Sequence, residues 1–223
     1  MASYVKSGGI VADIGCDHGF TSIYLVQNGF ARGAIAADIN KNPLAKAKEH
    51  IREYGLSEKI SVRLSDGAKS LKEGEADTIL ISGMGGALIT KILDESLDVI
   101  NSADELVLSP QSEIYLVRRF LHKKGFKITD EAMVYDKNKY YVIIRAVKGF
   151  EEYYSEFEYI YGKLLINSED EVFKRYLVKE RKRIENILPC LISEKLSRTA
   201  LERKLLLEDE YNMITKVLSS MGR

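Results

Sequence analysis

The chain of 223 residues has little cysteine, no long apolar run and no excess of charge of either sign. Its two cysteines, Cys16 and Cys190, lie far apart and lack Cys-x-x-Cys spacing, so we expect neither a metal site nor a disulfide framework. No apolar stretch reaches the roughly 18 residues that a membrane span requires. The segment 1–6 lacks the apolar core of a signal peptide. These absences predict a soluble, cytoplasmic protein, and we expect a monomer without a metal ion.

The charge balance restricts how the chain could bind nucleic acid. It has 33 Lys and Arg residues against 33 Asp and Glu residues, which gives a formal net charge of +0. A neutral chain does not attract a polyanion with its whole surface. Nucleic-acid binding would therefore require basic residues gathered on one face.

The first two thirds of the chain alternate short apolar runs with amphipathic stretches, which predicts a parallel, doubly wound sheet. The expected strands are residues 9–14, 33–38, 59–64, 76–82 and 105–109, and the expected helices are 20–29, 43–54, a helix after 86, and 113–124. Two more extended runs, 126–135 and 139–147, are separated by three residues and predict a hairpin at the edge of the sheet. A parallel sheet that ends in a hairpin is typical of the Rossmann-like, seven-stranded class I methyltransferase fold.

The pattern of apolar and charged residues changes after Gly149. Residues 151–188 and 193–218 are charged and have a helical apolar period, with Pro189 near the break between them. Two long helices joined by a short turn predict an antiparallel, coiled-coil-like hairpin. We therefore expect two domains, residues 1–149 and 150–223. Two apolar stripes are expected to form the core of the second domain and the contacts between its helices. They are Leu164, Leu165, Phe173, Tyr176, Leu177, Ile184, Ile187 and Leu188, and then Leu196, Leu201, Leu205, Tyr211, Ile214, Val217 and Leu218.

A glycine-containing turn follows the first expected strand and precedes a helix. It reads Asp13-Ile14-Gly15-Cys16-Asp17-His18-Gly19. Glycines allow a sharp turn and close approach of a ligand, but Asp17 stands where the phosphate-binding pattern has its second glycine. A carboxylate there would repel a pyrophosphate and would suit a cationic ligand such as the sulfonium and amino group of S-adenosylmethionine. A plain strand-to-helix turn is the alternative. His18 has no second histidine beside it in the sequence, so a metal site is not expected.

Polar residues also follow the next strands. Asp38 ends the second strand, where a carboxylate can accept both ribose hydroxyls of a nucleoside. Asp66-Gly67 follows the third strand and could contact an adenine edge, although Asp-Gly is common in turns. Because ligands of open α/β sheets bind at the carboxyl ends of the strands, these features together favour a nucleoside-containing cofactor.

Two further turns close the same edge of the expected sheet. The turn Ser82–Gly86 follows the fourth strand, leaves open backbone at its glycines and offers an apolar face at Met84. In amino-methylating enzymes this position presents the target base, while a helix-entry turn is an equally good reading. Gln111 follows the fifth strand and could hydrogen-bond a base edge, whereas Ser112 could equally cap a helix.

The chain resembles the bacterial TrmK family in several runs that occur in order. They are VADIGCDHGF, AADINKNPLAKAKEHI, RLSDG, ISGMGG, LSPQSE and the hairpin GFKITDE…NKYYVIIR. Members of the family methylate N1 of adenosine 22 in tRNA, and the resemblance extends from Val11 to about Leu188. Two differences are visible: Phe20 stands where the family more often has tyrosine, and the chain starts close to its first strand, so we expect a shortened N-terminus.

The resemblance implies roles for particular residues. S-adenosylmethionine is the implied cofactor and tRNA the implied partner, with a helical domain that helps to hold the tRNA. The matching cofactor positions are Asp13, Gly15, Asp17, His18, Asp38, Asn40, Asp66, Gly67, Ser82 and Gly83, and Met84 and Gly85 stand beside the transferred methyl group.

The expected reaction depends on the alignment of the substrate with the methyl group more than on a general base. Adenine N1 already has a lone pair at neutral pH, so the enzyme must place N1 in line with the methyl group and the sulfur. A carboxylate near N6 would stabilise the positive charge of the methylated base. Asp17 and Met84 are our candidate catalytic residues, and the alternative is that Asp17 only binds the amino group of the cofactor.

A flipped-out adenosine requires that the tRNA body be held elsewhere, mainly at its phosphates. Basic residues cluster in the first long C-terminal stretch, where a solvated helix face is the competing reading. They are Lys174, Arg175, Lys179, Arg181, Lys182 and Arg183, followed by Arg198, Arg203 and Lys204 in the second stretch.

Three other functions remain open from the sequence alone. The chain could be a small-molecule methyltransferase that uses its helical part as a lid or dimer contact. It could be a non-catalytic RNA-binding protein with a vestigial cofactor fold. It could also be an NAD-linked oxidoreductase, although Asp17 in place of the phosphate-loop glycine disfavours that function.

Overall fold

The computed structural model describes residues 1–6, 8–191 and 197–221. The chain divides into two compact units, which we call the sheet unit and the helical unit. The sheet unit comprises Met1–Ala132 and Tyr141–Tyr153, and the helical unit comprises Met133–Tyr140 and Tyr154–Arg223. The outer end of the predicted hairpin therefore belongs with the C-terminal helices.

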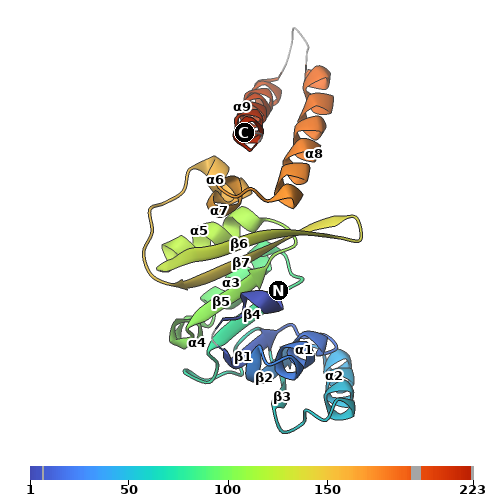
Figure 1. Ribbon diagram of the computed structural model, residues 1–223. Coiled ribbons are helices and arrows are strands. Elements are labelled where there is room, and N and C mark those ends of the chain that lie inside the picture. The colour runs from blue at the N-terminus through green and yellow to red at the C-terminus, as the bar shows by residue number, and fades with distance from the viewer. Residues whose placement is uncertain (7, 192–196, 222–223) are drawn as a thin grey trace. The chain divides into compact units, whose positions relative to one another are not determined.

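A seven-stranded sheet forms the centre of the fold, with the strand order β3-β2-β1-β4-β5-β7-β6 (Figure 1). The strands are β1 Gly8–Ile14, β2 Ala31–Asp38, β3 Ile60–Leu64, β4 Thr78–Ser82, β5 Glu105–Ser109, β6 Phe126–Asp136 and β7 Lys139–Lys148. The strands from β1 to β5 pair in parallel, and β7 pairs antiparallel to β5. All seven predicted strands are confirmed, as is the predicted class I methyltransferase sheet.

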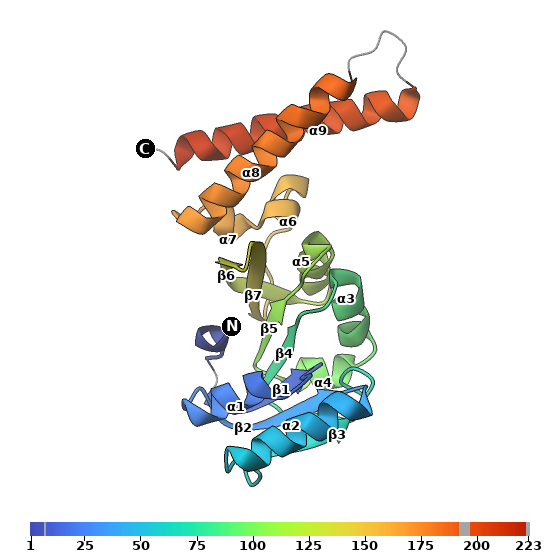
Figure 2. The same cartoon turned by 90° about the vertical axis from the view of Figure 1, so that its right-hand side faces the viewer.

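Helices cover both faces of this sheet (Figure 2). Helices α1 Phe20–Gln27 and α2 Lys41–Glu53 contact each other, and α3 Gly86–Asp94 contacts both α4 Leu97–Ser102 and α5 Ile114–Lys123. A short 3₁₀ helix, Ala2–Tyr4, precedes β1. Helix α4 was not predicted, because a helix of six residues is too short to display a clear apolar period.

The central strands are apolar on both faces because helices cover both sides of the sheet. The β4 core residues Ile79, Leu80 and Ile81 are completely buried. The glycine-rich turns at the carboxyl ends of the strands therefore extend from a rigid, close-packed layer.

The helical unit contains four α-helices among its described residues, and these differ from the prediction. They are α6 Glu156–Tyr161, α7 Lys163–Ile166, α8 Glu171–Ile187 and α9 Arg198–Ser220, with a 3₁₀ turn at Leu188–Leu191. The predicted single helix over 151–188 is wrong. A capping box at Ser155 and Glu158 starts α6, and Gly162 at φ +90° ends it. Asp170 then accepts hydrogen bonds from the backbone N–H groups of Val172 and Phe173, which starts α8.

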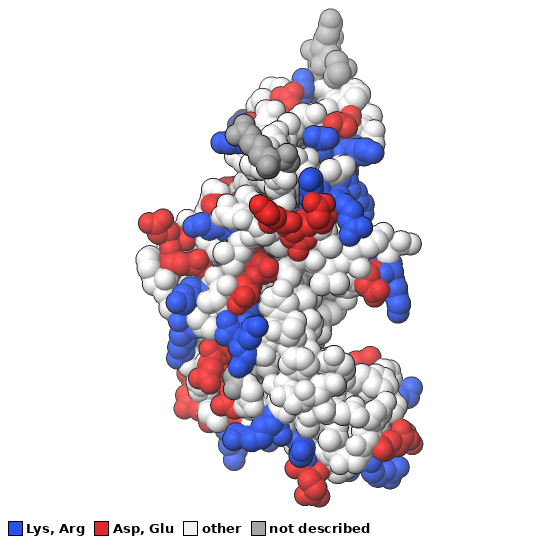
Figure 3. Space-filling view, in the orientation of Figure 1, with Lys and Arg blue, Asp and Glu red and all other residues white. Residues whose placement is uncertain are grey.

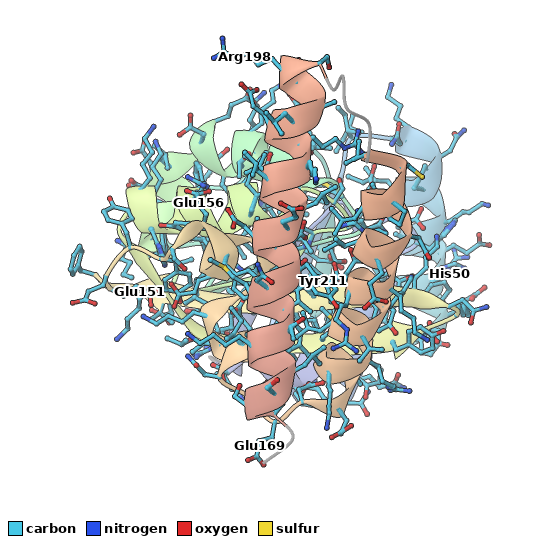
Figure 4. The ribbon with its side chains drawn as sticks, turned by 90° about the horizontal axis from the view of Figure 1, so that it is seen from above. His50, Glu151, Glu156, Glu169, Arg198 and Tyr211 are labelled. Atoms are coloured by element: carbon cyan, nitrogen blue, oxygen red, sulfur yellow. The ribbon has the colours of Figure 1, made fainter. Side chains whose placement is uncertain are left out.

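Helices α8 and α9 lie side by side, as Figure 4 shows from above. Phe173, Leu177 and Ile184 of α8 are completely buried, and the Tyr211 hydroxyl of α9 lies 3.1 Å from Glu185 Oε1 of α8. The predicted apolar stripe of α9 is wrong in its first turns, because Leu201 and Leu205 are exposed and Leu207 is buried instead. The predicted helix start at 193–196, including Leu196, lies outside the described residues. In the described part of the chain, no helix combines the length and the apolar character of a membrane span.

Candidate active site

A cavity of about 330 Å³ lies at the carboxyl ends of four parallel strands, β1 to β4, within the sheet unit. Its lining comes from the turns after those strands and from α3: Ile14, Gly15, Asp38, Ile39, Asn40, Ser65, Asp66, Gly67, Ser82, Gly83, Met84, Leu88 and Ile92. Turns that are far apart in the sequence thus meet in one place. The structure brings together eight of the predicted site residues, namely Gly15, Asp38, Asn40, Asp66, Gly67, Ser82, Gly83 and Met84.

Three glycines of the cavity adopt the left-handed backbone conformation. Their φ angles are +77° at Gly15, +61° at Gly67 and +78° at Gly83. Residues with a Cβ rarely adopt this conformation, because the Cβ atom approaches the following carbonyl oxygen. The glycines therefore let the backbone turn at the strand ends and keep the cavity open.

Asp38 holds the first two turns together. Its Oδ2 accepts a hydrogen bond from the Asp17 backbone N–H at 3.1 Å, and its Oδ1 accepts one from the Asn40 backbone N–H at 2.8 Å. The side chain is 8% exposed and lines the cavity. The carboxylate that the sequence assigned to a ribose therefore also fixes the shape of its own site.

Asp13 is absent from the lining of the cavity. Its carboxyl group is buried and accepts a hydrogen bond from the Ser22 hydroxyl at 2.8 Å. Burial raises the pKa of Asp13 to about 6, although the hydrogen bonds from Ser22 act in the opposite direction. Asp13 thus ties the end of β1 to the first turns of α1.

Asp17 and His18 belong to the turn after β1 and are also absent from the cavity lining. Asp17 adopts φ +49°, and 69% of its side chain is exposed. His18 Nε2 is 3.6 Å from Asp17 Oδ1, and its buried Nδ1 has no hydrogen-bond partner in the described part of the chain. Phe20 stacks on His50 with ring centroids 4.5 Å apart, so its ring packs against α2.

Asp66 stands at the opposite side of the cavity, after β3. Lys69 Nζ is 2.5 Å from Asp66 Oδ2 and 2.8 Å from Glu95 Oε2. The hydrogen bond from Lys69 lowers the pKa of Asp66, which keeps this exposed side chain in its anionic form.

The turns after β4 and β5 are joined by backbone hydrogen bonds. The Gln111 N–H donates to the Met84 carbonyl at 2.9 Å, and the Gly86 N–H donates to the Ser112 carbonyl at 2.8 Å. A Cβ on Gly86 would lie 2.3 Å from the Glu113 carbonyl oxygen, so only glycine permits this approach. The Gln111 amide nitrogen lies 3.7 Å from the position of a Cβ on Gly83. Gln111 therefore stands at the rim of the cavity, next to Met84.

Sequence reasoning missed the apolar walls of the cavity. Ile39 is 61% exposed, Leu88 is 48% exposed, and both line the cavity. Large apolar side chains left in contact with water beside polar groups are typical of ligand sites. The signal was present in the sequence, because Ile39 directly follows Asp38 in an otherwise polar turn.

A larger cavity of about 450 Å³ lies between α2 and β3, but its chemistry is poorer. It is lined by apolar residues with Lys41, Lys48, Ser57 and Ser61, and no carboxylate is among its lining residues. Within the described residues, no group of three or more His, Cys, Asp and Glu side chains could hold a metal ion. The smaller cavity is therefore the candidate active site.

Six of the basic residues predicted to bind tRNA lie on α8, where the structure separates them into groups, and Arg198, Arg203 and Lys204 lie on α9. Lys174, Arg181 and Arg183 form ion pairs, with Glu171, Glu185 and Glu180 respectively. The cationic groups of Arg175 and Lys179 instead lie over the rings of Tyr135 and Tyr140. Lys182 is exposed.

Comparison with known proteins identifies the family. The profile of TrmK, described as tRNA (adenine(22)-N(1))-methyltransferase, matches residues 11–212. The tRNA (adenine(22)-N(1))-methyltransferase of Bacillus subtilis is 39% identical over 149 residues, which is 67% of this chain and 63% of that protein. The sequence match thus spans less than two thirds of the length of the B. subtilis protein.

Solved structures agree over nearly the whole chain. The crystal structure of the B. subtilis m1A22 tRNA methyltransferase TrmK matches with a TM-score of 0.87 and 30% identity, covering 97% of this chain and 95% of that one. Streptococcus pneumoniae Sp1610, solved in complex with S-adenosyl-L-methionine, matches with a TM-score of 0.86 and 31% identity, covering 97% and 95%. The sheet order, the turns at the strand ends and these matches lead to one conclusion: the chain belongs to the TrmK family of tRNA (adenine(22)-N(1))-methyltransferases.

Proposed function

We propose that this protein transfers the methyl group of S-adenosylmethionine to N1 of adenosine 22 in tRNA. The observation that carries the proposal is the acidic, glycine-walled cavity at the strand ends of a TrmK-family chain. The turns that line it all belong to the sheet unit, as a monomeric enzyme requires, and we propose that the protein acts as a monomer. A tRNA substrate also implies that the protein works in the cytoplasm.

The residues of the cavity fit S-adenosylmethionine. Its volume of about 330 Å³ is within the ordinary range for small-molecule sites. Asp38 is placed to accept hydrogen bonds from ribose hydroxyls, and Ile39 and Leu88 offer apolar contact to an adenine ring. The turn after β1 presents no phosphate-binding glycine pattern, because Asp17 stands where that pattern has its second glycine, and a carboxylate there disfavours a pyrophosphate-containing cofactor.

The chain's own task in the reaction is positioning. S-adenosylmethionine would supply the methyl group from its sulfonium sulfur, which leaves as a neutral thioether, and adenine N1 would supply the electron pair for the new bond. The two joined turns, after β4 and β5, would hold the flipped base at the rim of the cavity, with Met84 against the ring and Gln111 near its polar edge. The solvent-facing carboxylate of Asp17 would stabilise the positive charge that forms on the base. In this proposal Asp13, Asn40 and His18 shape the turns that hold the cofactor.

The decisive experiment is methyl transfer from labelled S-adenosylmethionine to a bulk bacterial tRNA pool, followed by nucleoside analysis. We expect N1-methyladenosine to form in the tRNA pool. We expect none to form in a tRNA transcript whose adenosine 22 is substituted. Intact cofactor binding with no transfer to tRNA would contradict the proposal and favour a small-molecule substrate. An Asp38→Asn variant serves as the matched negative control, because it retains the size of the side chain.

A further inference from the structure

The outer end of the β6–β7 hairpin and one face of α8 form a surface that the proposed active site does not use. All of its residues belong to the helical unit. Arg175, Lys179 and Lys182 are spaced i, i+4 and i+7 along α8, so they share one side of the helix. Unlike Lys174, Arg181 and Arg183, they have no carboxylate within ion-pair distance among the described residues. Figure 3 shows Lys and Arg side chains gathered over α8.

Two tyrosines of the hairpin lie against these cations. The Arg175 guanidinium carbon is 5.8 Å from the centre of the Tyr135 ring, and Lys179 Nζ is 5.3 Å from the centre of the Tyr140 ring. The two rings are 4.7 Å apart. Tyr140 also contacts Tyr176 of α8, with ring centroids 5.2 Å apart. The hairpin end is therefore fixed to α8 by aromatic packing.

Tyr135 remains available despite these contacts, because 42% of its surface is exposed. Its hydroxyl is 3.1 Å from Asn138 Oδ1, which orients the ring. A rigid, exposed aromatic ring beside cations has the composition of a site that stacks an unpaired base and binds the neighbouring phosphates.

The turn between β6 and β7 contributes two lysines to this surface, one of them in an unfavourable backbone conformation. Lys137 and Asn138 have φ angles of +45° and +64°, the pattern of a tight hairpin turn that favours Asn and Gly. Asn tolerates this conformation, whereas lysine rarely adopts it. Lys137 and Lys139 are both exposed, and Asp136 is the acidic residue of the turn. A strained position occupied by lysine rather than glycine points to a use for its charge.

We propose that Tyr135, with Arg175, Lys179 and Lys182, stacks an unpaired nucleotide of the RNA substrate and binds the adjacent phosphates. This inference rests on the proposed function for the identity of the RNA. It extends the RNA-binding surface from the predicted helix to the hairpin. The sequence predicted six equivalent basic residues as the RNA-binding site. The proposed site instead consists of the three cations on one face of α8 and an aromatic ring.

The absence of tryptophan from the chain provides a direct test. In a Tyr135→Trp variant the single indole would report stacking, because a stacked base quenches its fluorescence. We expect saturating quenching during titration with an unmodified tRNA transcript, with the midpoint given by the anisotropy of labelled tRNA. A Tyr54→Trp variant is the matched control, since Tyr54 is 49% exposed and lies in the sheet unit. Binding of tRNA to Tyr135→Trp at wild-type affinity without quenching would overturn the proposal.

Substitutions separate stacking from folding. Tyr135→Phe keeps the ring and should retain tRNA affinity, whereas Tyr135→Ala should lose about 5- to 100-fold, the range typical of one stacked base. Equal affinity of the two variants, with equal thermal unfolding, would contradict the inference. Quenching of Tyr135→Trp by anionic phospholipid vesicles but not by tRNA would assign the surface to a membrane and would also overturn it.

Failure of this inference is distinguishable from failure of the proposed function. Quenching by tRNA in a protein that forms no N1-methyladenosine would refute the reaction and support the surface. Formation of N1-methyladenosine by a protein whose Tyr135→Trp variant binds tRNA without quenching would do the opposite.

Discussion

The Met84 methyl group lies where a side chain at Gly15 would have to be: a Cβ built on Gly15 would be 2.1 Å from Met84 Cε. The two residues belong to the turns after β1 and β4, and both line the candidate active site. Met84 thus reaches across the cavity to the turn after β1.

Replacement of Gly15 with alanine should destabilise the protein and abolish binding of S-adenosylmethionine. The left-handed backbone alone costs about 1–2 kcal/mol for a residue with a Cβ, and the contact with Met84 adds to this cost. Gly29→Ala is the matched control, because Gly29 has φ +74° and open space around it. We expect both variants to lose unfolding free energy in urea, Gly15→Ala more, and only Gly15→Ala to lose cofactor binding by calorimetry. Equal losses in the two variants would show that the contact with Met84 has no effect.

Asp13 should make stability depend on pH. Its pKa is raised to about 6 in the folded protein from about 3.8, so the folded state holds the proton more tightly than the unfolded state. The stabilisation is complete below pH 4 and is lost as the pH rises through 6. Asp13→Asn cannot titrate, so its unfolding free energy relative to wild type should rise across this window by on the order of 2–3 kcal/mol. Denaturant unfolding at several pH values measures the difference, and a constant difference would refute the raised pKa.

Substitutions at Asp17 show whether methyl transfer depends on its charge or on the backbone conformation of the turn after β1. Asp17→Asn keeps the size of the side chain and tolerates the positive φ, so we expect normal folding and cofactor affinity. Turnover should fall by about 10- to 1,000-fold if the carboxylate stabilises charge on the base. Asp17→Gly should relieve backbone strain, raise the unfolding temperature and still lose turnover. Loss of cofactor affinity without a separate effect on turnover would assign Asp17 to cofactor binding alone.

Charge reversal should show whether Lys179 and Lys182 of α8 contact the phosphates of tRNA. The Lys179→Glu and Lys182→Glu variants should weaken tRNA binding, and each should reduce the slope of log affinity against log salt by about 1. Lys216→Glu, an exposed change on α9 in the same unit, is the control and should leave the slope unchanged. An unchanged slope in all three variants would identify α8 as a solvated face.

The fold was predictable where the chain repeats one pattern and has short connections. All seven strands were predicted within a few residues, because the five parallel strands appear as continuous apolar runs between turns and a short turn separates the two strands of the hairpin. The helical unit was predicted less well. Ser155, Gly162 and Asp170 divide one apparent helix into three, and capping residues of this kind are hard to weigh against a long amphipathic period.

The polar residues of the site could be predicted from the sequence. Which of them line the cavity could not. Strand ends identified Asp38 and Asp66, and both line the cavity. Asp13 and Asp17 occur in the same motif, yet one is buried and the other faces solvent. Sequence spacing gives the order of side chains along a turn, whereas the direction of each one depends on φ angles and packing that appear only in the folded chain.

The grouping of residues 133–140 with the C-terminal helices has a consequence for dissecting the protein. The backbone passes between the two units three times, at 132–133, 140–141 and 153–154. A gene truncated after residue 149 would yield a fragment that carries the hairpin end without the helix on which its tyrosines pack. The helical half expressed alone would expose the rings of Tyr161 and Tyr176 that continue that packing. The hairpin end and the C-terminal helices therefore cannot be separated by a simple truncation. The role of each surface should be tested by substitution of its residues rather than by deletion of whole segments.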